Sequence, residues 1–184
     1  IEDAGLLKFD FLGIRNLAIL GDAISLVKKF YNVDIDIEKI PLDDKKTFAM
    51  LTHGETMGLF QLNGAGMTRY LKELKPTTIH DINAMVALYR PGPLGSGMVD
   101  VFVDRKHGRE KIDYVTPELA NILNETYGVI VYQEQVMQIC RDVSGFSMAE
   151  ADNVRKAMGK KDADKMASYK DQFVAGAQSV SAMT

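Results

Sequence analysis

A lysine and an aspartate two residues apart are the first side chains in this sequence that could do chemistry together. Lys8 and Asp10 lie in residues 6–13, whose other members are apolar residues or glycine. In a β-strand, alternate side chains point to opposite faces, so Lys8 and Asp10 would share a face that Phe9 does not. Desolvating an ionised carboxylate is costly unless a cation, a metal ion or hydrogen-bond donors compensate it. The run therefore predicts either a site for a metal-bound anionic ligand or an exposed ion pair at a strand edge.

A second group with chemical potential is a set of four cations within seven residues, namely Arg155, Lys156, Lys160 and Lys161. Positive charge near the end of a helix complements the negative pole of the helix dipole, so a solvated helix face is one interpretation. The other is a polyphosphate contact, in which arginine makes bidentate hydrogen bonds and lysine acts as a point charge. The segment does not form a Walker-type phosphate loop, because Val154 stands where that loop needs glycine.

Composition indicates an ordinary soluble globular protein of one domain, or of one domain plus a piece of another. The chain has 184 residues, 46% apolar and 26% charged, with a net charge of −3. This charge argues against a wholly basic nucleic-acid coat protein. Cys140 is the only cysteine, which excludes an intrachain disulfide and suits a reducing compartment. We see no membrane-spanning run and no signal peptide, so we expect a cytoplasmic protein without a membrane partner. Because the chain begins with Ile1, we also expect an excised segment.

The order of apolar positions, caps and breakers predicts elements that are mostly helical. Alternating or β-branched residues predict short strands at residues 6–13, 34–37 and 127–131, and residues 54–62 predict a turn followed by a short strand. Residues 90–97 predict a rigid, glycine-rich connector. The expected fold is therefore mainly α with a few short strands (α+β). Helices are expected over residues 13–31, 45–52, 65–74, 78–90, 98–106, 133–143, 147–158 and 162–176, with a short one after Pro117.

Six motifs, in this order, resemble the C family of bacterial replicative DNA polymerases, to which the polymerase III α subunit belongs. Each motif is weak alone, but their order over nearly the whole chain is specific. They are KFDFLG at residues 8–13, GLFQL at 58–62, ALYRPGPL at 87–94, RKHG at 105–108, YGVIVYQEQVM at 127–137 and RKAMGKK at 155–161.

This resemblance implies that residues 1–13 are a terminal piece of the polymerase palm and that residues 14–184 begin the largely helical fingers domain, which is truncated here. Asp10 resembles the third carboxylate of the catalytic triad that binds two Mg²⁺ ions. The other two aspartates are expected in an upstream palm segment that this sequence does not contain. The implied reaction is two-metal nucleotidyl transfer to a primer 3′-hydroxyl.

The same resemblance assigns the cations. Lys8 and Arg155 are expected to contact the triphosphate of the incoming nucleotide. Lys156 is expected to share this role, although many relatives carry arginine there and a lysine lacks the bidentate fork. Arg90, Lys160 and Lys161 are further candidates for nucleotide or DNA contacts, or for structural roles.

The implied partners are primer-template DNA, a deoxynucleoside triphosphate, the rest of the polymerase chain and the replicative holoenzyme subunits, including the sliding clamp. The fragment alone is expected to be inactive, because one carboxylate cannot assemble a two-metal site. Two alternatives remain from the residues. One is a non-catalytic helical module that binds nucleic acid or nucleotides through residues 155–165, and the other is an independent NTPase, which the missing phosphate loop disfavours.

Overall fold

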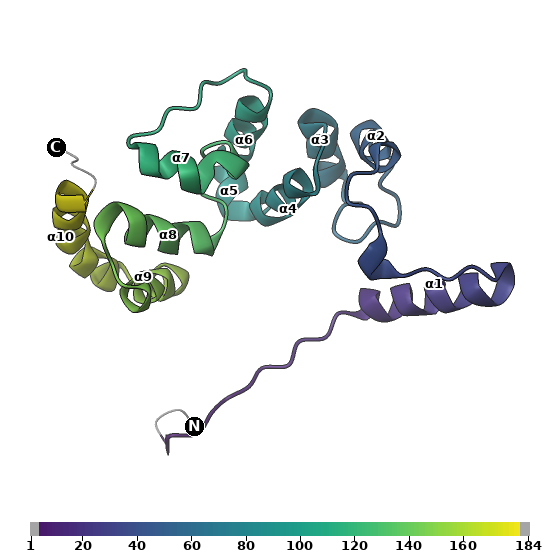
Figure 1. Ribbon diagram of the computed structural model, residues 1–184, viewed down its shortest axis with the longest axis horizontal. Coiled ribbons are helices and arrows are strands. Elements are labelled where there is room, and N and C mark those ends of the chain that lie inside the picture. The colour runs from purple at the N-terminus through teal and green to yellow at the C-terminus, as the bar shows by residue number, and fades with distance from the viewer. Residues whose placement is uncertain (1–3, 181–184) are drawn as a thin grey trace. The chain divides into compact units, whose positions relative to one another are not determined.

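The chain divides between Leu42 and Asp43 into two units, each described separately below. The computed structural model describes residues 4–180. The first unit contains helix α1 (Arg15–Tyr31) and a short 3₁₀ helix, η2 (Ile37–Lys39) (Figure 1). Asn32 ends α1 in the left-handed conformation, with φ of 54°, and its N–H donates to the carbonyl of Lys28. This matches the predicted end of the helix.

The strand predicted at residues 6–13 is wrong, because this segment forms neither a helix nor a strand. A strand is stable only when its N–H and C=O groups pair with those of a neighbouring strand, and residues 4–180 contain no strand at all. The side chains lie in the open as a consequence, with Phe11 96% and Leu12 92% exposed.

The other three predicted strands are also wrong, so the described chain is all-α and not α+β. Residues 34–37 instead lead into η2. At the start of this 3₁₀ helix, the N–H of Glu38 donates to the Asp36 carboxylate. Residues 58–62 form turns, with positive φ at Gly58 and Gln61. In residues 127–131, Tyr127 has a φ of 52°, which is incompatible with a strand.

The second unit consists of helices joined by short connections (Figure 1). Most of them agree with the sequence prediction, because their starts carry the expected caps: Asp44, Thr78 and Ser147 each accept a hydrogen bond from a first-turn N–H. The predicted connector at 90–97 instead contains a short helix. The helices are α2 (Lys45–His53), α3 (Ala65–Leu74), α4 (Ile79–Leu88), α5 (Pro91–Gly95), α6 (Met98–Lys106), α7 (Pro117–Leu123), the 3₁₀ helix η3 (Asn124–Thr126), α8 (Gln133–Ser144), α9 (Met148–Lys160) and α10 (Ala163–Val180).

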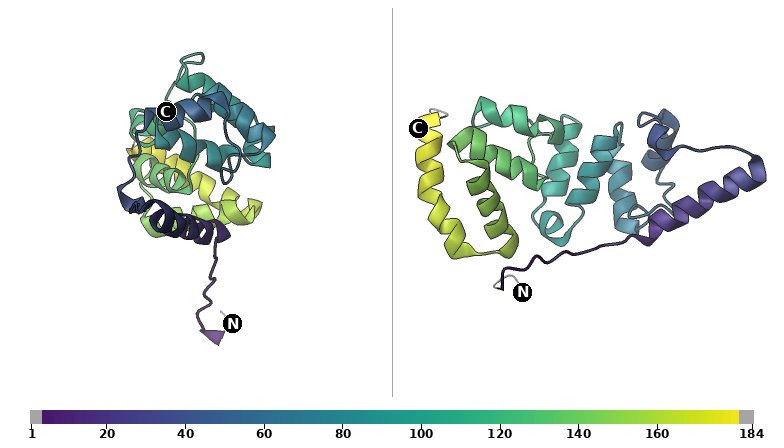
Figure 2. Two further views of the ribbon diagram at one scale, coloured as in Figure 1. Left: turned by 90° about the vertical axis from the view of Figure 1, so that its right-hand side faces the viewer. Right: turned by 60° about the horizontal axis from the view of Figure 1, so that its bottom comes forward.

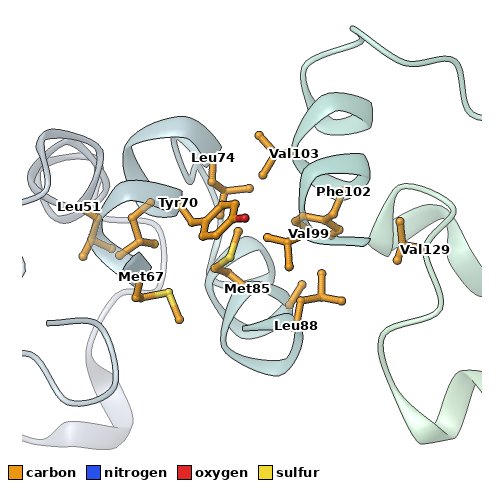
Figure 3. Close-up of a cluster of buried hydrophobic side chains, with 12 residues drawn as sticks. Leu51, Met67, Tyr70, Leu74, Met85, Leu88, Val99, Phe102, Val103 and Val129 are labelled. Carbon is orange, nitrogen blue, oxygen red and sulfur yellow. The ribbon is translucent and has the colours of Figure 1, made fainter. Parts of the chain in front are cut away.

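The main core lies where α2, α3, α4 and α6 meet (Figure 3). Its side chains point toward one another from these four helices, and Val129 joins them from the segment before α8 (Figure 3). Leu71, Leu74, Met85, Val99 and Phe102 are almost completely excluded from solvent. Burial of this kind, at about 25 cal/mol per Å² of apolar surface, is what holds the short helices together.

A second group is formed by α8, α9 and α10, which lie side by side at the C-terminal end of this unit (Figures 1 and 2). Phe146, Cys140 and Val154 are buried among them. The crossing of α8 and α10 is close, because a Cβ on Gly176 would lie 2.0 Å from the backbone oxygen of Ser144. Only glycine fits at that position.

An ion pair buried inside the second unit joins three separate segments. Asp81 is 2% exposed, and its carboxylate accepts hydrogen bonds from Lys106 Nζ at 2.8 Å and from the Tyr127 hydroxyl at 3.0 Å. The backbone N–H groups of Thr77, at 2.8 Å, and Thr78, at 3.2 Å, also donate to it.

Burial raises the pKa of the Asp81 carboxyl, but Lys106 and these donors outweigh burial and leave the pKa below its usual value. Burial and the Asp81 charge together raise the pKa of Tyr127 to about 12, so its hydroxyl remains a donor.

Replacing Lys106 by methionine should therefore destabilise the fold strongly, because it leaves the buried Asp81 charge without its cation. We expect a loss of about 3–5 kcal/mol in the free energy of unfolding, measured by urea denaturation. Arg109→Met is the matched control, since Arg109 pairs with Asp104 at 2.6 Å on the surface, and it should cost about 1 kcal/mol or less. Equal losses in the two variants would contradict a structural role for the buried pair.

Candidate anion-binding site

A pocket of about 560 Å³ opens between the start of α5, the start of α8 and the end of α9. It brings together two arginines that are 65 positions apart in the sequence (155 minus 90), Arg90 before α5 and Arg155 in α9. Apolar side chains, among them Ile130, Val136 and Met158, form part of its wall. The pocket therefore combines positive charge with an apolar surface.

Arg155 is fixed by neighbours from two helices. Its Nε and Nη2 atoms each lie 2.8 Å from Oδ1 of Asp152, one turn earlier in α9. Its Nη1 atom donates to Oε1 of Gln133, the first residue of α8, at 3.2 Å. The guanidinium group is thus held at the boundary between α8 and α9, with part of it exposed.

Arg90 reaches the pocket from a different direction. It precedes Pro91, which is the first residue of α5, and its backbone is extended. The neighbouring Tyr89 is packed closely against α3, because Gly66 has no side chain: a Cβ there would lie 2.1 Å from the Tyr89 hydroxyl oxygen. Within residues 4–180, no carboxylate lies within 4.0 Å of the Arg90 side-chain nitrogens, so its charge is not neutralised by an ion pair.

The N-terminus of α8 adds a further positive contribution, because the first N–H groups of a helix and its dipole favour anions. Gln133 and Tyr132, at this terminus, line the pocket. Burial raises the pKa of the Tyr132 hydroxyl, with the Glu125 charge as a second cause.

The segment that leads into α8 is held in place by one buried glutamine. Oε1 of Gln135 accepts hydrogen bonds from the N–H groups of Val131, at 2.8 Å, and Tyr132, at 3.0 Å. Its Nε2 atom donates to the hydroxyl of Thr126 at 2.8 Å and to the carbonyl of Ile122 at 3.3 Å. Because residues 127–132 have no regular structure, this side chain sets the position of the pocket wall that they form.

The other predicted cations do not line the pocket. Lys156 Nζ pairs with Oδ2 of Asp152 at 2.7 Å on an exposed face of α9. Successive residues of a helix point about 100° apart, so Lys156 and Lys160 share a face that differs from the face of Arg155. Lys161 ends the helix in the left-handed conformation. The hydrogen bonds from Lys156 and then Arg155 lower the pKa of Asp152.

Lys8 and Asp10 lie in the first unit. Lys8 Nζ is 3.8 Å from Oδ1 of Asp10, and the two side chains are 60% and 86% exposed. This is the geometry of an exposed ion pair. Among residues 4–180, no cluster of three or more His, Cys, Asp or Glu side chains could hold a metal ion.

Sequence reasoning missed several members of the pocket. The motif at residues 127–137 contains Tyr132 and Gln133 without indicating that they line a pocket. Asp152 does not line the pocket, and no sequence signal indicates that it pairs with Arg155. A polar run that opens a helix, such as residues 132–135, was the available signal. No local signal placed Ile130 or Met158 next to Arg90.

In the part of the chain that the structure covers, no helix has the length and apolarity needed to cross a bilayer.

Gln135→Leu should destabilise the second unit by about 1–3 kcal/mol, because it leaves the part-buried N–H groups of Val131 and Tyr132 without their acceptor and removes the donor to the buried Thr126 hydroxyl oxygen. Urea denaturation measures this loss. Gln172→Leu, which removes an exposed glutamine bonded to Glu150 at 2.9 Å, should change the free energy of unfolding by about 0.5 kcal/mol or less. If the two variants were equally stable, Gln135 would not hold the pocket wall.

Comparison with known proteins identifies relatives over nearly the whole chain. The sequence profile of the bacterial DNA polymerase III alpha subunit finger domain matches residues 16–181. The DNA polymerase III subunit alpha of Aquifex aeolicus (strain VF5) is 53% identical over 177 residues, which cover 96% of this chain and 15% of that relative. The subunit of Campylobacter jejuni subsp. jejuni is 51% identical over 178 residues, covering 97% and 15%, and that of Escherichia coli (strain K12) is 49% identical over 187 residues, covering 97% and 16%. The chain thus spans only about 15% of the length of these relatives.

Proposed function

The chain belongs to the bacterial DNA polymerase III alpha subunit finger domain family, and on this premise we propose that it serves a DNA-directed DNA polymerase by binding the triphosphate of the incoming deoxynucleotide. The observation that supports this proposal is the convergence of Arg90, Arg155 and the N-terminus of α8 on one pocket. The relatives are named as DNA polymerase III alpha subunits, which agrees with the family of replicative polymerases that the sequence motifs resemble.

The chemistry of the pocket suits a triphosphate. Arginine offers parallel N–H groups that match phosphate oxygens, and the helix terminus adds a fixed positive potential. The volume of about 560 Å³ is in the range of small-molecule sites. The side chains of Val136 and Met158 make part of the pocket wall apolar, and the lower local dielectric constant beside such a wall strengthens the electrostatic attraction to an anion.

The described residues do not by themselves fit a two-metal centre, since Asp10 is exposed and is not joined by other carboxylates. We propose that Asp10 supplies one ligand to divalent metal ions, expected to be Mg²⁺, and that the remaining ligands come from the rest of the polymerase. In this proposal residues 1–13 belong to the palm and residues 14–184 to the fingers. Lys8 is then proposed to contact the triphosphate near these metals.

The exposed cations have a different proposed role. Lys156, Lys160 and Lys161 do not line the pocket, so contacts to primer-template DNA or to a part of the nucleotide outside the pocket suit them better. The proposed partners of the whole protein remain the DNA, the nucleotide, the rest of the chain and the holoenzyme subunits with the sliding clamp, in the cytoplasm.

Arg155→Ala should weaken the binding of inorganic tripolyphosphate to this chain by about ten- to a hundredfold, because charge-assisted hydrogen bonds contribute about 1.5–3 kcal/mol. Isothermal titration calorimetry at fixed salt measures the affinity. Arg141→Ala is the matched control, since Arg141 is an exposed α8 arginine outside the pocket and paired with Asp142. Equal affinities of the two variants would refute the assignment of this pocket.

Asp10→Ala in the longer polymerase should abolish primer extension while leaving primer-template binding within about twofold, because a metal ligand acts in the reaction and not in DNA binding. Extension assays and fluorescence anisotropy measure the two properties. Asp34→Ala is a control on an exposed carboxylate of the same unit, paired with Lys28. Normal synthesis by the Asp10 variant would remove Asp10 from the metal site and favour a non-catalytic binding module.

A further inference from the structure

We propose that Asp152 is the positioning residue of this site: it holds the Arg155 guanidinium in the orientation that receives a phosphate group. The inference rests on the proposed function of the pocket. It concerns a carboxylate beside a site for anions, where a negative charge alone would weaken binding.

The geometry around Asp152 uses both of its carboxylate oxygens. Oδ1 accepts a hydrogen bond from Nε of Arg155 at 2.8 Å and lies 2.8 Å from its Nη2, and Oδ2 forms an ion pair with Nζ of Lys156 at 2.7 Å. These partners follow at positions i+3 and i+4 of α9, where side chains of one helix meet. The carboxylate is therefore held by two cations, and it holds Arg155 along one edge in return.

A count of donors shows what remains for a ligand. A guanidinium group has five N–H bonds in one plane. In Arg155, the Nε–H donates to Asp152 and one N–H of Nη1 donates to Gln133, while Nη2 forms an ion pair with Asp152 at 2.8 Å. The second N–H of Nη1 and the N–H groups of Nη2 therefore make no hydrogen bond to these two partners. Because Asp152 belongs to α9 and Gln133 to α8, the plane of the group is fixed from two elements. Arg155 lines the pocket, so the remaining N–H groups on its Nη atoms are the ones available to an anion there.

Holding Arg155 before the ligand arrives lowers the conformational entropy that binding must otherwise remove from a long, flexible side chain. The opposing effect is the negative charge of Asp152, which reduces the local positive potential. The two effects predict opposite results when the carboxylate is removed. A neutralising role predicts tighter anion binding, since Asp152→Ala raises the net charge by one unit and frees Lys156. A positioning role predicts weaker binding.

The test is a calorimetric titration of the chain with inorganic tripolyphosphate at constant salt. We expect Asp152→Ala to bind about tenfold more weakly than the unsubstituted chain, and Asp152→Glu, which keeps a carboxylate within reach, to stay within about threefold. Asp142→Ala makes the same change in net charge on α8, where Asp142 pairs with Arg141 outside the pocket, and should bind as the unsubstituted chain does.

When Asp152→Ala is combined with Arg155→Ala, it should add no further loss of affinity to that of Arg155→Ala alone. Alanine is the best helix former, and circular dichroism verifies that α9 is retained.

The outcomes separate this inference from the proposed function. If Arg155→Ala loses affinity but Asp152→Ala binds as tightly as the unsubstituted chain or more tightly, Asp152 does not position Arg155, while the pocket assignment stands. If tripolyphosphate does not bind, or Arg155→Ala binds normally, both are overturned. In the longer polymerase, a positioning role also predicts a rise of about tenfold in the nucleotide KM for Asp152→Ala with a smaller change in kcat.

Discussion

The charge buried at Asp81 is the constraint on which the second unit depends. An ionised carboxylate with 2% exposure is tolerated only because Lys106 and the Tyr127 hydroxyl, from distant parts of the sequence, join the Thr77 and Thr78 backbone in surrounding it. These contacts tie the start of α4 to the end of α6 and to the segment that precedes α8. Phe102 packs edge-on against the Tyr127 ring, with 5.2 Å between ring centroids, so the polar centre adjoins the apolar core. One carboxylate thus connects the hydrophobic core to the segment that forms a pocket wall.

The candidate site depends on the same principle at a more exposed location. Gln135 satisfies the backbone of residues 131 and 132, and Asp152 and Gln133 hold Arg155 from two helices. These hydrogen bonds fix the polar side chains around the pocket, so the pocket is largely formed without a ligand. A preformed positive site loses little of its own conformational entropy when a polyphosphate binds, which suits the proposed binding of a nucleotide triphosphate. The close contact at Gly176 keeps α10 against the C-terminal end of α8, at the opposite end of this helix from Gln133 and the pocket.

Most helices could be predicted because their signals are local. Asp44, Thr78 and Ser147 satisfy the first N–H groups of their own helices, and Asn32 adopts the left-handed conformation at the end of α1. The absence of strands could not be predicted, because a strand depends on a partner strand that local sequence does not reveal. Residues 6–13 have the alternation of a strand, yet residues 4–180 provide no strand with which they could form hydrogen bonds. At residues 58–62 and 127–131, positive φ angles override the β-branched and aromatic composition.

The sequence by itself determined the family, through six motifs in order, and it identified Arg90 and Arg155 among the candidate cations. It also determined where most helices begin and end, since caps and periodicity act within a few residues. Only the tertiary structure decided that these two arginines share a pocket while Lys156 lies on another face of α9 beside Asp152. The physical reason is that charge compensation and pocket shape depend on helix packing, which brings together residues far apart in the sequence. No local pattern specifies which side chains meet across α5, α8 and α9.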